Sequence, residues 1–599
     1  MADGGPAIAD FLGVARSLTG RRWRQRAGDE AAIRALQSQS GLPQFLAQAL
    51  ASRGVTTDTA ETFLNPTLRA LFPNPSSFAG MDGAAAILVD ALVRNRPTWV
   101  FADYDVDGAS SAAQLVRWFR HMGAELPIHI PDRLAEGYGP TPATFRRLQA
   151  MGAELVITLD CGAAAEMALA EAEAIGLDVV VIDHHLMRGA PSGRAIIVNP
   201  NQPDCGSGQG VLAAAGVTFV LLAALNREAR RRGLFETRAP PDLRRWLDLA
   251  ALGAICDVTQ LSGFNRAIVS QGLKVMSRWE NPGMAALMQV ATAPLTKATT
   301  HHAGFVLGPR INAGGRIGRS DLGARLLATD DAIEAGELAR ELDRLNSERR
   351  DIERSILASA IASIEHQSNL DRDAPALVIT GDDWHPGVIG IVAGRLRERY
   401  RKPVVVIGID RQADLGRGSG RSAAGINLGR AVQMAEAEGL LIAGGGHAMA
   451  AGLTIRPSSI PEFRAFLNKT LETEAAASDD SLAVDFLTSP VAADRGMLGA
   501  IERLAPFGPG NPEPTVALAE VRCERVRAIK GGHLRCALTS PGGGRLEAVA
   551  WRADNSPLAR AIAAGGVLNV VGRLKADDWK GRGGVELEVE DAADPRQRS

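Results

Sequence analysis

The stretch PTWVFADYDVDG at residues 97–108 determines how the rest of the chain is interpreted. An apolar run at 99–101 is followed by aspartates at alternate positions, Asp103, Asp105 and Asp107, and then by Gly108. A short apolar, β-rich run is typical of a buried strand, and Asp-Gly is typical of the beginning of a helix. The stretch therefore predicts a strand, a turn and a helix, with carboxylates at the carboxyl end of the strand.

Three similar apolar runs follow, at residues 155–159, 179–182 and 196–198, with helical stretches between them. Continuous Val/Ile-rich runs that alternate with helices predict a parallel sheet covered on both faces. Residues 209–330 then have a mainly helical pattern. We expect one α/β unit over residues 81–330.

Two later strands of this sheet also end in polar residues, Asp160-Cys161-Gly162 and Asp183-His184-His185. The functional crevice of an open α/β sheet lies beyond the carboxyl ends of its strands, so the three loops should converge. Five carboxylates and two imidazoles in one place repel one another unless cations neutralise them. Asp257, which follows an apolar segment at 249–256, also needs a buried partner. The pattern predicts a pair of divalent metal ions.

Each loop alone has a simpler explanation, because Asp-rich turns cap helices and paired histidines are often structural. Three acidic loops in register favour the metal site. Carboxylates with one or two imidazoles suit Mn²⁺ or Mg²⁺, although Cys161 and Cys256 beside ligand candidates leave zinc formally open. Two such ions suit displacement at phosphorus, where one lowers the pKa of a water and the other stabilises the leaving oxygen. The sequence predicts a metal-dependent phosphoesterase.

The second half of the chain has a different organisation. A long helical pattern at about 330–366 carries apolar residues at helical spacing and could separate two lobes. Strand-like runs at 376–379 and 404–407 indicate a second α/β unit, residues 470–481 a polar linker, and residues 482–595 a small barrel of short strands.

Composition excludes several classes of protein. The chain of 599 residues has 66 Lys+Arg against 68 Asp+Glu and a net charge of −2, so no basic excess indicates a nucleic-acid partner. Seven of the basic residues are lysine and 59 are arginine, the side chain best suited to phosphate. Five scattered cysteines argue against disulfides and zinc fingers. We found no signal peptide, and the longest apolar run, at 211–225, is shorter than the ~20 residues that span a bilayer, so we expect a cytoplasmic protein without a membrane partner.

The N-terminal residues 1–80 indicate a small helical segment, interrupted by prolines. Five arginines between Arg16 and Arg26 surround Trp23. We interpret them as a solvated helix face in preference to a nucleic-acid contact.

With these motifs in place, the chain resembles the DHH phosphoesterase superfamily and, within it, the RecJ family of bacterial single-strand-specific 5′→3′ DNA exonucleases. The loop at 103–108 and Asp183-His184-His185 carry the resemblance, and supporting motifs follow in order at 137–139, 308–316, 385–390, 444–447 and 506–512. The resemblance implies a helical segment (1–80), a parallel-sheet DHH catalytic domain (81–330), a long connecting helix (331–370), a smaller α/β DHHA1 domain (371–478) and an OB-fold barrel (479–599).

The resemblance also implies a centre of two Mn²⁺ or Mg²⁺ ions. Its implied ligands are Asp103, Asp105, Asp107, Asp160, His184, His185 and Asp257, with Asp183 in support. The residues expected to act in catalysis are Asp105, Asp160, His184 and His447. Many members of the superfamily have a histidine where this chain has Phe101, which we take as a metal bound by carboxylates and not as a lost site.

The DNA contacts are expected in the second lobe and beside the metals. Residues 416–422 predict a flexible Gly-rich loop able to hold a phosphate, with a plain hairpin turn as the alternative. By resemblance, Arg133, Ser419 and Arg421 anchor the 5′ end, Tyr138 stacks on a base, and His447 faces a phosphate. Arg310 and Arg316 line the strand path, or are structural. Trp551, Trp579, Lys575, Lys580 and Arg582 are candidates for the barrel, where Trp is equally often core.

The sequence therefore predicts a two-metal, single-stranded-DNA-specific 5′→3′ exonuclease that releases 5′-mononucleotides in recombination and repair. The resemblance adds single-stranded-DNA-binding protein and a RecQ-type helicase as partners, and association with the nucleoid. Two alternatives remain at this point: an oligoribonuclease or cyclic-dinucleotide phosphodiesterase of the same superfamily, and a non-catalytic single-strand-binding factor. The first class is typically shorter, and the second should have lost its metal ligands.

Overall fold

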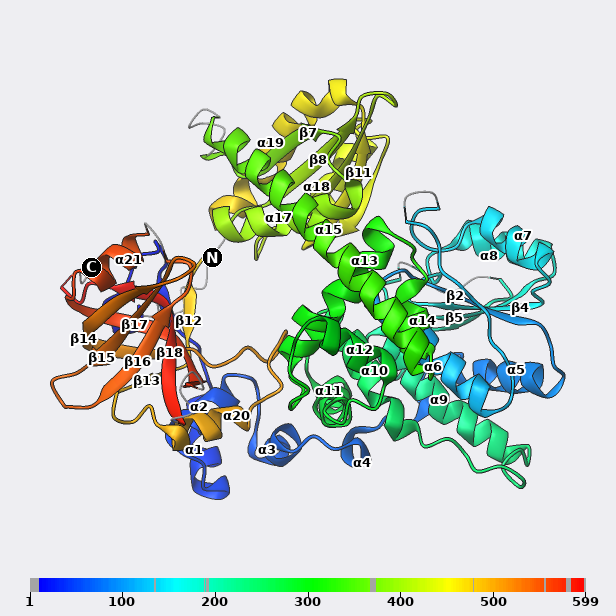
Figure 1. Cartoon of the computed structure of the whole chain (residues 1–599), viewed down its shortest axis with the longest axis horizontal. Coiled ribbons are helices and arrows are strands. Elements are labelled where there is room, and N and C mark those ends of the chain that lie inside the picture. Colours follow the sequence, from blue (N-terminus) through cyan, green and yellow to red (C-terminus); the bar gives the residue numbers. More distant parts are fainter. Residues whose placement is uncertain are drawn as a thin grey trace, which may run out of the picture. The chain divides into compact units, whose positions relative to one another are not determined.

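The structure is a computed structural model that describes residues 10–133, 136–187, 189, 193–366, 373–477, 479–553, 556–577 and 583–596. The chain divides into two compact units (Figure 1). The first consists of residues 1–71, 260–263 and 480–599, and the second of residues 72–259 and 264–479. We describe each unit by itself.

The second unit begins with the predicted parallel sheet, so the α/β class is confirmed. Its strands are β2 (Thr98–Ala102), β3 (Ile128–His129), β4 (Leu155–Leu159), β5 (Asp178–Ile182) and β6 (Ile196–Val198), in the order β3-β2-β4-β5-β6. Helices α7 (Pro142–Ala150) and α8 (Glu166–Ala174) lie on one face, and α5 (Met81–Val93), α6 (Val106–His121) and α9 (Ala214–Arg231) lie on the other (Figure 1). Because both faces are covered, every residue of β4 is buried.

A group of helices follows the sheet, as the pattern at 209–330 predicts. Its members are α10 (Leu247–Cys256), α11 (Gly263–Met276), α12 (Pro282–Val290), the π-helix η4 (His302–Leu307), α13 (Gly308–Ile317) and α14 (Leu322–Ala328). The long helix α15 (Ala332–Glu365) comes next. Leu338, Leu342 and Leu345 are buried in its first half, and Ile356 in its second half joins the core of the next sheet.

The second sheet of this unit is mixed. Its strands are β7 (Leu377–Asp382), β8 (Val404–Asp410), β9 (Leu415–Arg421), β10 (Ala443–His447) and β11 (Ala450–Ile455), in the order β10-β11-β9-β8-β7. Only β7 and β8 are parallel. Helices α15 and α17 (Pro386–Tyr400) cover one face, and α18 (Leu428–Ala437) and α19 (Ile460–Ala477) cover the other. The predicted linker at 470–481 is wrong in its first part, because α19 continues to Ala477 and buries Leu471.

The predicted flexible loop at 416–422 is also wrong, because these residues form β9 between β8 and β11. A Cβ at Gly418 would lie 2.7 Å from Leu453, and one at Gly420 would lie 2.7 Å from Leu428. The alternate glycines therefore let neighbouring apolar side chains pack directly onto the strand. Successive residues of a strand face opposite sides, so Ser419 and Arg421 share the other face.

The first unit joins the N-terminal segment to the C-terminal strands. Strand β1 (Trp23–Gln25) pairs in parallel with β12 (Leu482–Val484), and Trp23 is fully buried. The predicted solvated helix face at Arg16–Arg26 is therefore wrong, since a buried tryptophan in a strand needs the partner strand more than 450 residues later. Buried Asp485 pairs with Arg53 at 3.2 Å and with Arg26 at 3.3 Å. The helices of this segment are α1 (Glu30–Ser40), α2 (Gln44–Ala51), α3 (Thr57–Leu64) and α4 (Leu68–Leu71).

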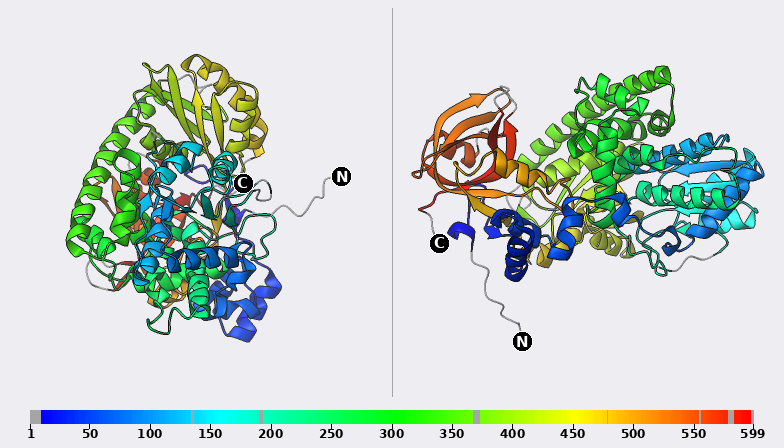
Figure 2. Two further views of the ribbon diagram at one scale, coloured as in Figure 1. Left: turned by 90° about the vertical axis from the view of Figure 1, so that its right-hand side faces the viewer. Right: turned by 90° about the horizontal axis from the view of Figure 1, so that it is seen from below.

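The C-terminal strands form a closed ring. β14 (Val516–Ile529), β15 (His533–Thr539), β16 (Arg545–Ala550), β18 (Gly584–Ala593) and β17 (Val567–Asp577) pair in that order, and β17 pairs back with β14 (Figure 2). Five strands closed in this way are the arrangement of an OB fold. Strand β13 (Phe486–Thr488) pairs in parallel with the first residues of β14, and α20 (Arg495–Glu502) and α21 (Pro557–Ala563) complete this part.

The barrel residues singled out in the sequence have different environments. Trp551 is 50% exposed and donates from Nε1 to Glu588. Lys575 forms an ion pair with Glu513 at 2.6 Å. Trp579, Lys580 and Arg582 lie outside the described residues.

Among the described residues, no single helix combines the length and the apolar composition that a membrane span requires. The pair 68–77 and 81–93 meets both criteria only jointly, with a bend of 82° between its members.

The packing against β9 predicts an asymmetry between two glycines on adjacent strands. Gly418→Val should destabilise the second unit by about 1–3 kcal/mol, because the new side chain overpacks against Leu453 and Ile407. Gly452 on β11 has no neighbour within 4 Å of a Cβ, so Gly452→Val is the matched control and should cost less. Urea unfolding of both variants provides the measurement, and equal losses would contradict this packing.

Candidate metal centre

The three aspartates of the first loop lie where β2 gives way to α6. Asp105 is the N-cap of α6, and its Oδ1 accepts from the backbone N–H groups of Asp107 at 2.8 Å and Gly108 at 3.1 Å. A Cβ at position 108 would lie 2.4 Å from the Asp103 carbonyl oxygen, so the tight turn after Asp103 requires glycine there. The capping interpretation and the metal interpretation thus apply to the same loop.

Asp107 is held rigidly at the N-terminus of another helix. It is 1% exposed, and its two oxygens accept from the backbone N–H groups of Ala214 at 2.7 Å and Ala215 at 2.9 Å in α9. The partial positive charge of a helix N-terminus stabilises a carboxylate there. Gly253 of α10 packs against it, since a Cβ at this position would lie 2.4 Å from the Asp107 Oδ1.

Asp160 follows β4 and has an unusual backbone. Its φ is +61°, in the left-handed region that non-glycine residues seldom adopt and that is often found at functional sites. The side chain is 2% exposed. Its Oδ1 lies 3.3 Å from the His184 Nε2.

Asp183 supports the two histidines and does not face the cluster directly. One oxygen accepts from Ala163 N, and the other accepts from the backbone N–H groups of both histidines and contacts His185 Nδ1 at 2.8 Å. Burial opposes its ionisation, but the hydrogen bonds with His185 and Ala163 lower the pKa of Asp183 to about 2. Burial likewise acts against a charged His185, but Asp183 raises the pKa of that imidazole to about 9. A carboxylate behind a histidine fixes the orientation of its ring, as in many metal sites.

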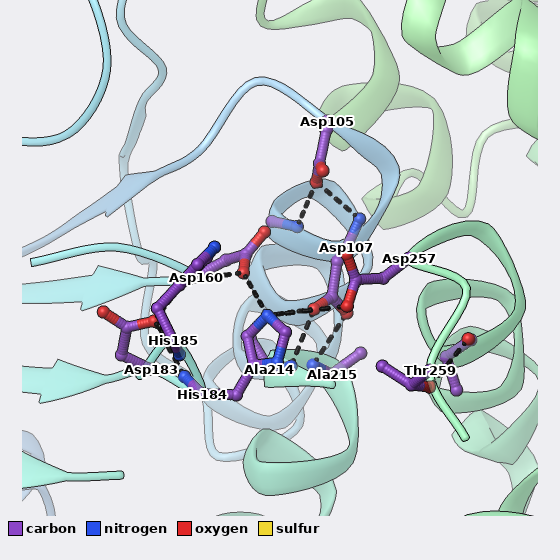
Figure 3. A network of polar contacts seen from close by, with 12 residues as sticks. Asp105, Asp107, Asp160, Asp183, His184, His185, Ala214, Ala215, Asp257 and Thr259 are labelled. Atoms are coloured by element: carbon purple, nitrogen blue, oxygen red, sulfur yellow. Dashed lines mark hydrogen bonds and ion pairs between the residues drawn. The ribbon is translucent and has the colours of Figure 1, made fainter. Parts of the chain in front are cut away.

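His184 brings the strand ends and α10 together (Figure 3). Its Nε2 lies 3.8 Å from Asp107, 3.3 Å from Asp160 and 3.6 Å from Asp257. Burial and the charge of His185 lower the pKa of His184 to about 4, so the ring is neutral near pH 7. The ring also hydrogen-bonds the backbone of Leu212. A neutral imidazole is the form that binds a metal.

All seven predicted ligands occur in three groups whose ligand atoms lie within 4.8 Å of one another. The groups are Asp107, His184 and Asp257; Asp103, Asp105 and Asp160; and Asp160, His184 and His185. Asp160 and His184 are each shared by two groups, which is the arrangement expected where two ions lie side by side.

The buried polar atoms test whether a metal fits. Asp103 Oδ1, Asp160 Oδ1 and His184 Nε2 are buried and have no hydrogen-bond partner among the described residues. Such groups cost about 1–3 kcal/mol each, or more if charged, when unsatisfied. All three are donors of the kind that bind Mn²⁺ and Mg²⁺, so the residues present fit the ions.

Electrostatics leads to the same conclusion. Burial, followed by the charge of neighbouring aspartates, raises the pKa of Asp103, Asp107 and Asp160 well above the ordinary value. Burial and the charge of Asp105 raise the pKa of Asp257 to about 7. The carboxylates cannot all ionise together at neutral pH without added positive charge.

Beside the acidic centre, the same unit gathers arginines. The Arg133 guanidinium lies over the Tyr104 ring at 5.1 Å from its centroid. Arg316 donates to the Gly387 carbonyl at 3.0 Å, and Arg421 donates to the Ser419 Oγ at 3.2 Å. Burial and the charges of Arg133, Arg349 and Arg421 lower the pKa of Arg316 to about 10. No ion pair with a described carboxylate involves Arg133, Arg316 or Arg421, so we name these three residues with Ser419 the arginine pocket.

The N-terminus of α17 faces this pocket. A Cβ at Gly390 would lie 2.8 Å from the Ser419 Oγ and 3.1 Å from an Arg421 nitrogen. His385 is the N-cap of the helix, and burial and the charge of Arg133 lower its pKa. Guanidiniums, a hydroxyl and a helix N-terminus together form an anion-binding site.

The remaining predicted residues lie elsewhere or are already engaged. Tyr138 is 55% exposed, and its hydroxyl lies 3.3 Å from the Asp160 carbonyl oxygen and from His185. Arg310 is buried, pairs with Asp343 at 2.9 Å and donates to the Val306 carbonyl, so its side chain serves the α13–α15 contact. His447 is exposed at the end of the edge strand β10, and no hydrogen bond or ion pair among the described residues joins it to the seven ligands.

The sequence interpretation missed two asparagines that hold the histidine loop. Asn199 Nδ2 donates to the His185 carbonyl at 2.8 Å, and Asn201 Nδ2 donates to the His184 carbonyl at 2.6 Å. They follow β6, the next strand of the sheet. The same strand-end argument that selected the aspartates would have found them.

The fold and the site define a DHH-type metal-dependent phosphoesterase. Family models agree: the DHH family, N-terminal domain, matches residues 97–254, the DHHA1 domain matches 373–473, and the RecJ OB domain matches 484–591.

Individual proteins make the comparison more specific. The single-stranded-DNA-specific exonuclease RecJ of Dickeya dadantii (strain 3937) is 34% identical over 568 residues, covering 92% of this chain and 96% of the relative. The RecJ of Bacillus subtilis (strain 168) is 33% identical over 577 residues, covering 96% and 71%. The crystal structure of RecJ in complex with Mn²⁺ from Thermus thermophilus superposes with a TM-score of 0.77 at 30% identity, covering 95% of this chain and 78% of that one. A second structure of that protein, in complex with Mg²⁺, gives a TM-score of 0.72. The chain belongs to the RecJ family.

The raised pKa of Asp257 predicts how the metal-free protein responds to pH. A carboxyl with a folded pKa of about 7 and an unfolded pKa of about 3.9 holds more protons in the folded state, so stability falls as pH rises from about 4 to about 7. In EDTA at pH 8, Asp257→Asn should therefore raise the thermal midpoint by roughly 2–4 °C, the shift that ~1 kcal/mol gives in a unit of this size. At pH 4 the variant and the parent should agree.

The control is Asp204→Asn, since Asp204 is exposed and outside the cluster. It should show no pH-dependent gain. A loss of stability for Asp257→Asn at pH 8 in EDTA would contradict the repulsion that we infer. Excess Mn²⁺ should stabilise the parent more than the Asp257→Asn variant.

Proposed function

We propose that this chain is a metal-dependent exonuclease that degrades single-stranded DNA from the 5′ end and releases 5′-mononucleotides, in recombination and repair. The observation that carries the proposal is a set of buried ligand atoms, on Asp103, Asp160 and His184, that have no hydrogen-bond partner among the described residues. Beside them lie three arginines that form no ion pair with a described carboxylate. Hydrolysis of a phosphodiester needs positive charge at the reacting phosphate, and cations at a neighbouring phosphate position the substrate.

The metal ligands are proposed as Asp103, Asp105, Asp107, Asp160, His184, His185 and Asp257, which would hold two ions, Mn²⁺ or Mg²⁺. When bound, such ions lower the pKa of a water and neutralise charge that develops on the phosphoryl oxygens. Asp183 orients His185, and the N-terminus of α9 fixes Asp107. The chain therefore supplies a rigid set of ligands and needs no side-chain nucleophile.

The arginine pocket is proposed to hold the 5′-terminal phosphate. Arg133, Arg316 and Arg421 provide planar donors, and Ser419 adds a hydroxyl. Tyr104 lies between two metal ligands in the chain and under the Arg133 guanidinium, so it fixes the distance between pocket and metals. An anchor for a chain end at a fixed distance from the ions favours removal of one nucleotide at a time.

Two further residues, Tyr138 and His447, are proposed to contact the substrate. Tyr138 offers an exposed ring beside His185 for stacking on a base. His447, on the exposed end of β10, is proposed to contact a phosphate when substrate is bound. Arg310 is buried and paired with Asp343, so it is not among the proposed contacts.

The domain boundaries at 80, 330, 370 and 478 also remain a proposal. The three matched stretches at 97–254, 373–473 and 484–591 lie inside the proposed DHH, DHHA1 and OB domains. The N-terminal segment groups with the barrel in one compact unit, so it is proposed as a support of the OB domain. We further propose a cytoplasmic, nucleoid-associated protein whose partners are single-stranded-DNA-binding protein and a RecQ-type helicase, because both proteins occur where single strands are generated.

Strands labelled at either end test the activity. With Mn²⁺ or Mg²⁺, the protein should release labelled mononucleotides at once only from 5′-labelled single strands, and EDTA should stop the reaction. Asp105→Asn should abolish cleavage and leave DNA binding largely intact, because Asn keeps the helix cap but removes the charge. Asp331→Asn, which changes the N-cap of α15 in the same way, is the matched control and should stay active. Release from 3′ ends, or an active Asp105→Asn, would overturn the proposal.

The arginine pocket predicts a preference for a 5′-phosphate. Arg421→Lys should lower kcat/KM on 5′-phosphorylated strands by about tenfold to a hundredfold, since a charged hydrogen-bonding group is replaced by one of different geometry. The effect on 5′-hydroxyl strands should be much smaller. Arg417→Lys is the matched control, because Arg417 is on the same face of β9 but about 13 Å along it. Equal losses on both substrates would exclude a terminal-phosphate contact.

A further inference from the structure

A row of four aromatic rings crosses the surface of the second unit, outside the metal centre and the arginine pocket. Its members are Trp279, His302, His301 and Phe305, with successive ring centroids 6.3 Å, 6.2 Å and 5.3 Å apart. We name these four residues the aromatic row. Nothing in the metal centre or in the proposed 5′ anchor uses them.

The end of the row at Phe305 is open to solvent. Phe305 is 70% exposed, and its ring lies nearly parallel to that of His301, at 18°. A single exposed phenylalanine needs no explanation. The exposed phenylalanine is stacked on an exposed histidine, and the row continues edge-on to the half-buried His302 at 75° and Trp279 at 77°, so the stacked pair at the Phe305 end is the part left open to solvent.

The row is fixed to the element that carries a metal ligand. Phe305 lies in the π-helix η4, and such irregular helices often mark functional positions. The Cys256 thiol donates to the Ala303 carbonyl at 3.6 Å, and a Cβ at Gly304 would meet Ile255 at 3.5 Å. Helix α10 ends at Cys256, and the next residue is Asp257. The packing that places Asp257 at the metals therefore also places the aromatic row.

The charges around the row suit a polyanion. Neither His301 nor His302 has an ion pair among the described residues, and burial and the charge of His301 lower the pKa of His302, so that ring is neutral at pH 7. Arg278 precedes Trp279, and Lys297 is two residues before Thr299, which contacts His302. Neither Arg278 nor Lys297 pairs with a carboxylate in the described part of the chain. Exposed aromatic rings accompanied by such cations are the pattern that binds single-stranded nucleic acid.

We infer that the aromatic row is a stacking platform for bases of the single strand beyond the nucleotide being removed. The inference rests on the proposed function, because it takes the occupant from the substrate of the metal centre. A duplex keeps its bases stacked inside, so the platform accepts only bases that are unpaired. Base–aromatic stacking tolerates any sequence, as a general exonuclease requires.

A double-mutant cycle between ring and base tests the inference with the full-length protein and Mn²⁺. One abasic site is moved along a 5′-phosphorylated strand, and kcat/KM for removal of the first nucleotide is measured for the parent and for Phe305→Ala. Loss of one stacked base should lower kcat/KM of the parent by about tenfold at one or two internal positions. At those positions, the abasic site should cost Phe305→Ala little or nothing further, and Phe305→Trp should restore the parent pattern.

Ile333→Ala is the control, since Ile333 is 75% exposed on α15 and outside the row; it should behave as the parent at every position. His301→Ala provides a second variant and should weaken the same positions as Phe305→Ala. Equal abasic penalties in the parent and in Phe305→Ala at all positions would overturn the platform and assign the row to another partner, such as a protein. Absence of cleavage by the parent itself would instead overturn the proposed function.

Discussion

The mutual repulsion of buried carboxylates at the ends of two parallel strands is the constraint on which the rest of this structure depends. Asp103, Asp107 and Asp160 are nearly inaccessible to water, and burial raises the pKa of each. The surrounding helices hold Asp107 in place. Helix α9 donates two backbone N–H groups to its carboxylate, and Gly253 leaves space for the side chain. Without cations, this cluster lowers the stability of the folded state. With cations, its geometry allows tight binding, so we interpret it as a binding site and not as a structural element.

The same unit separates its charges over a short distance. The acidic centre needs cations, whereas burial and the charges of neighbouring arginines lower the pKa of Arg316 and of Arg421, so these guanidiniums need an anion. In the proposed function a phosphodiester chain would satisfy both, because its terminal phosphate would neutralise the arginine pocket while the next phosphate would lie at the metal centre. This explains why a net charge of −2 over the whole chain is compatible with a DNA substrate. The distribution of charge, and not its sum, determines the partner.

Much of this could be predicted from the sequence, for identifiable reasons. Hydrophobic runs such as 155–159 predicted the strands, because the strands of a sheet covered on both faces must be apolar throughout. The residues directly after the carboxyl ends of these strands then predicted that Asp160 and His184 belong to the site. The prediction of a loop at 416–422 was wrong because glycines usually indicate a loop. In strand β9 they instead leave space for Leu453 and Leu428, and this packing cannot be seen in the local sequence. The pairing of β1 with β12 joins segments more than 450 residues apart, and no local pattern could predict it. The structural role of Arg310 could not be predicted from local sequence either, because its partner Asp343 lies on another helix.

The central claim is that these ligands hold two ions that share Asp160. Crystals of the full chain grown with Mn²⁺ and measured at the manganese absorption edge test it most directly. The account predicts two anomalous peaks, one among Asp107, His184 and Asp257 and the other among Asp103, Asp105 and Asp160, with Asp160 contacting both. A single peak, or peaks away from these residues, would contradict it.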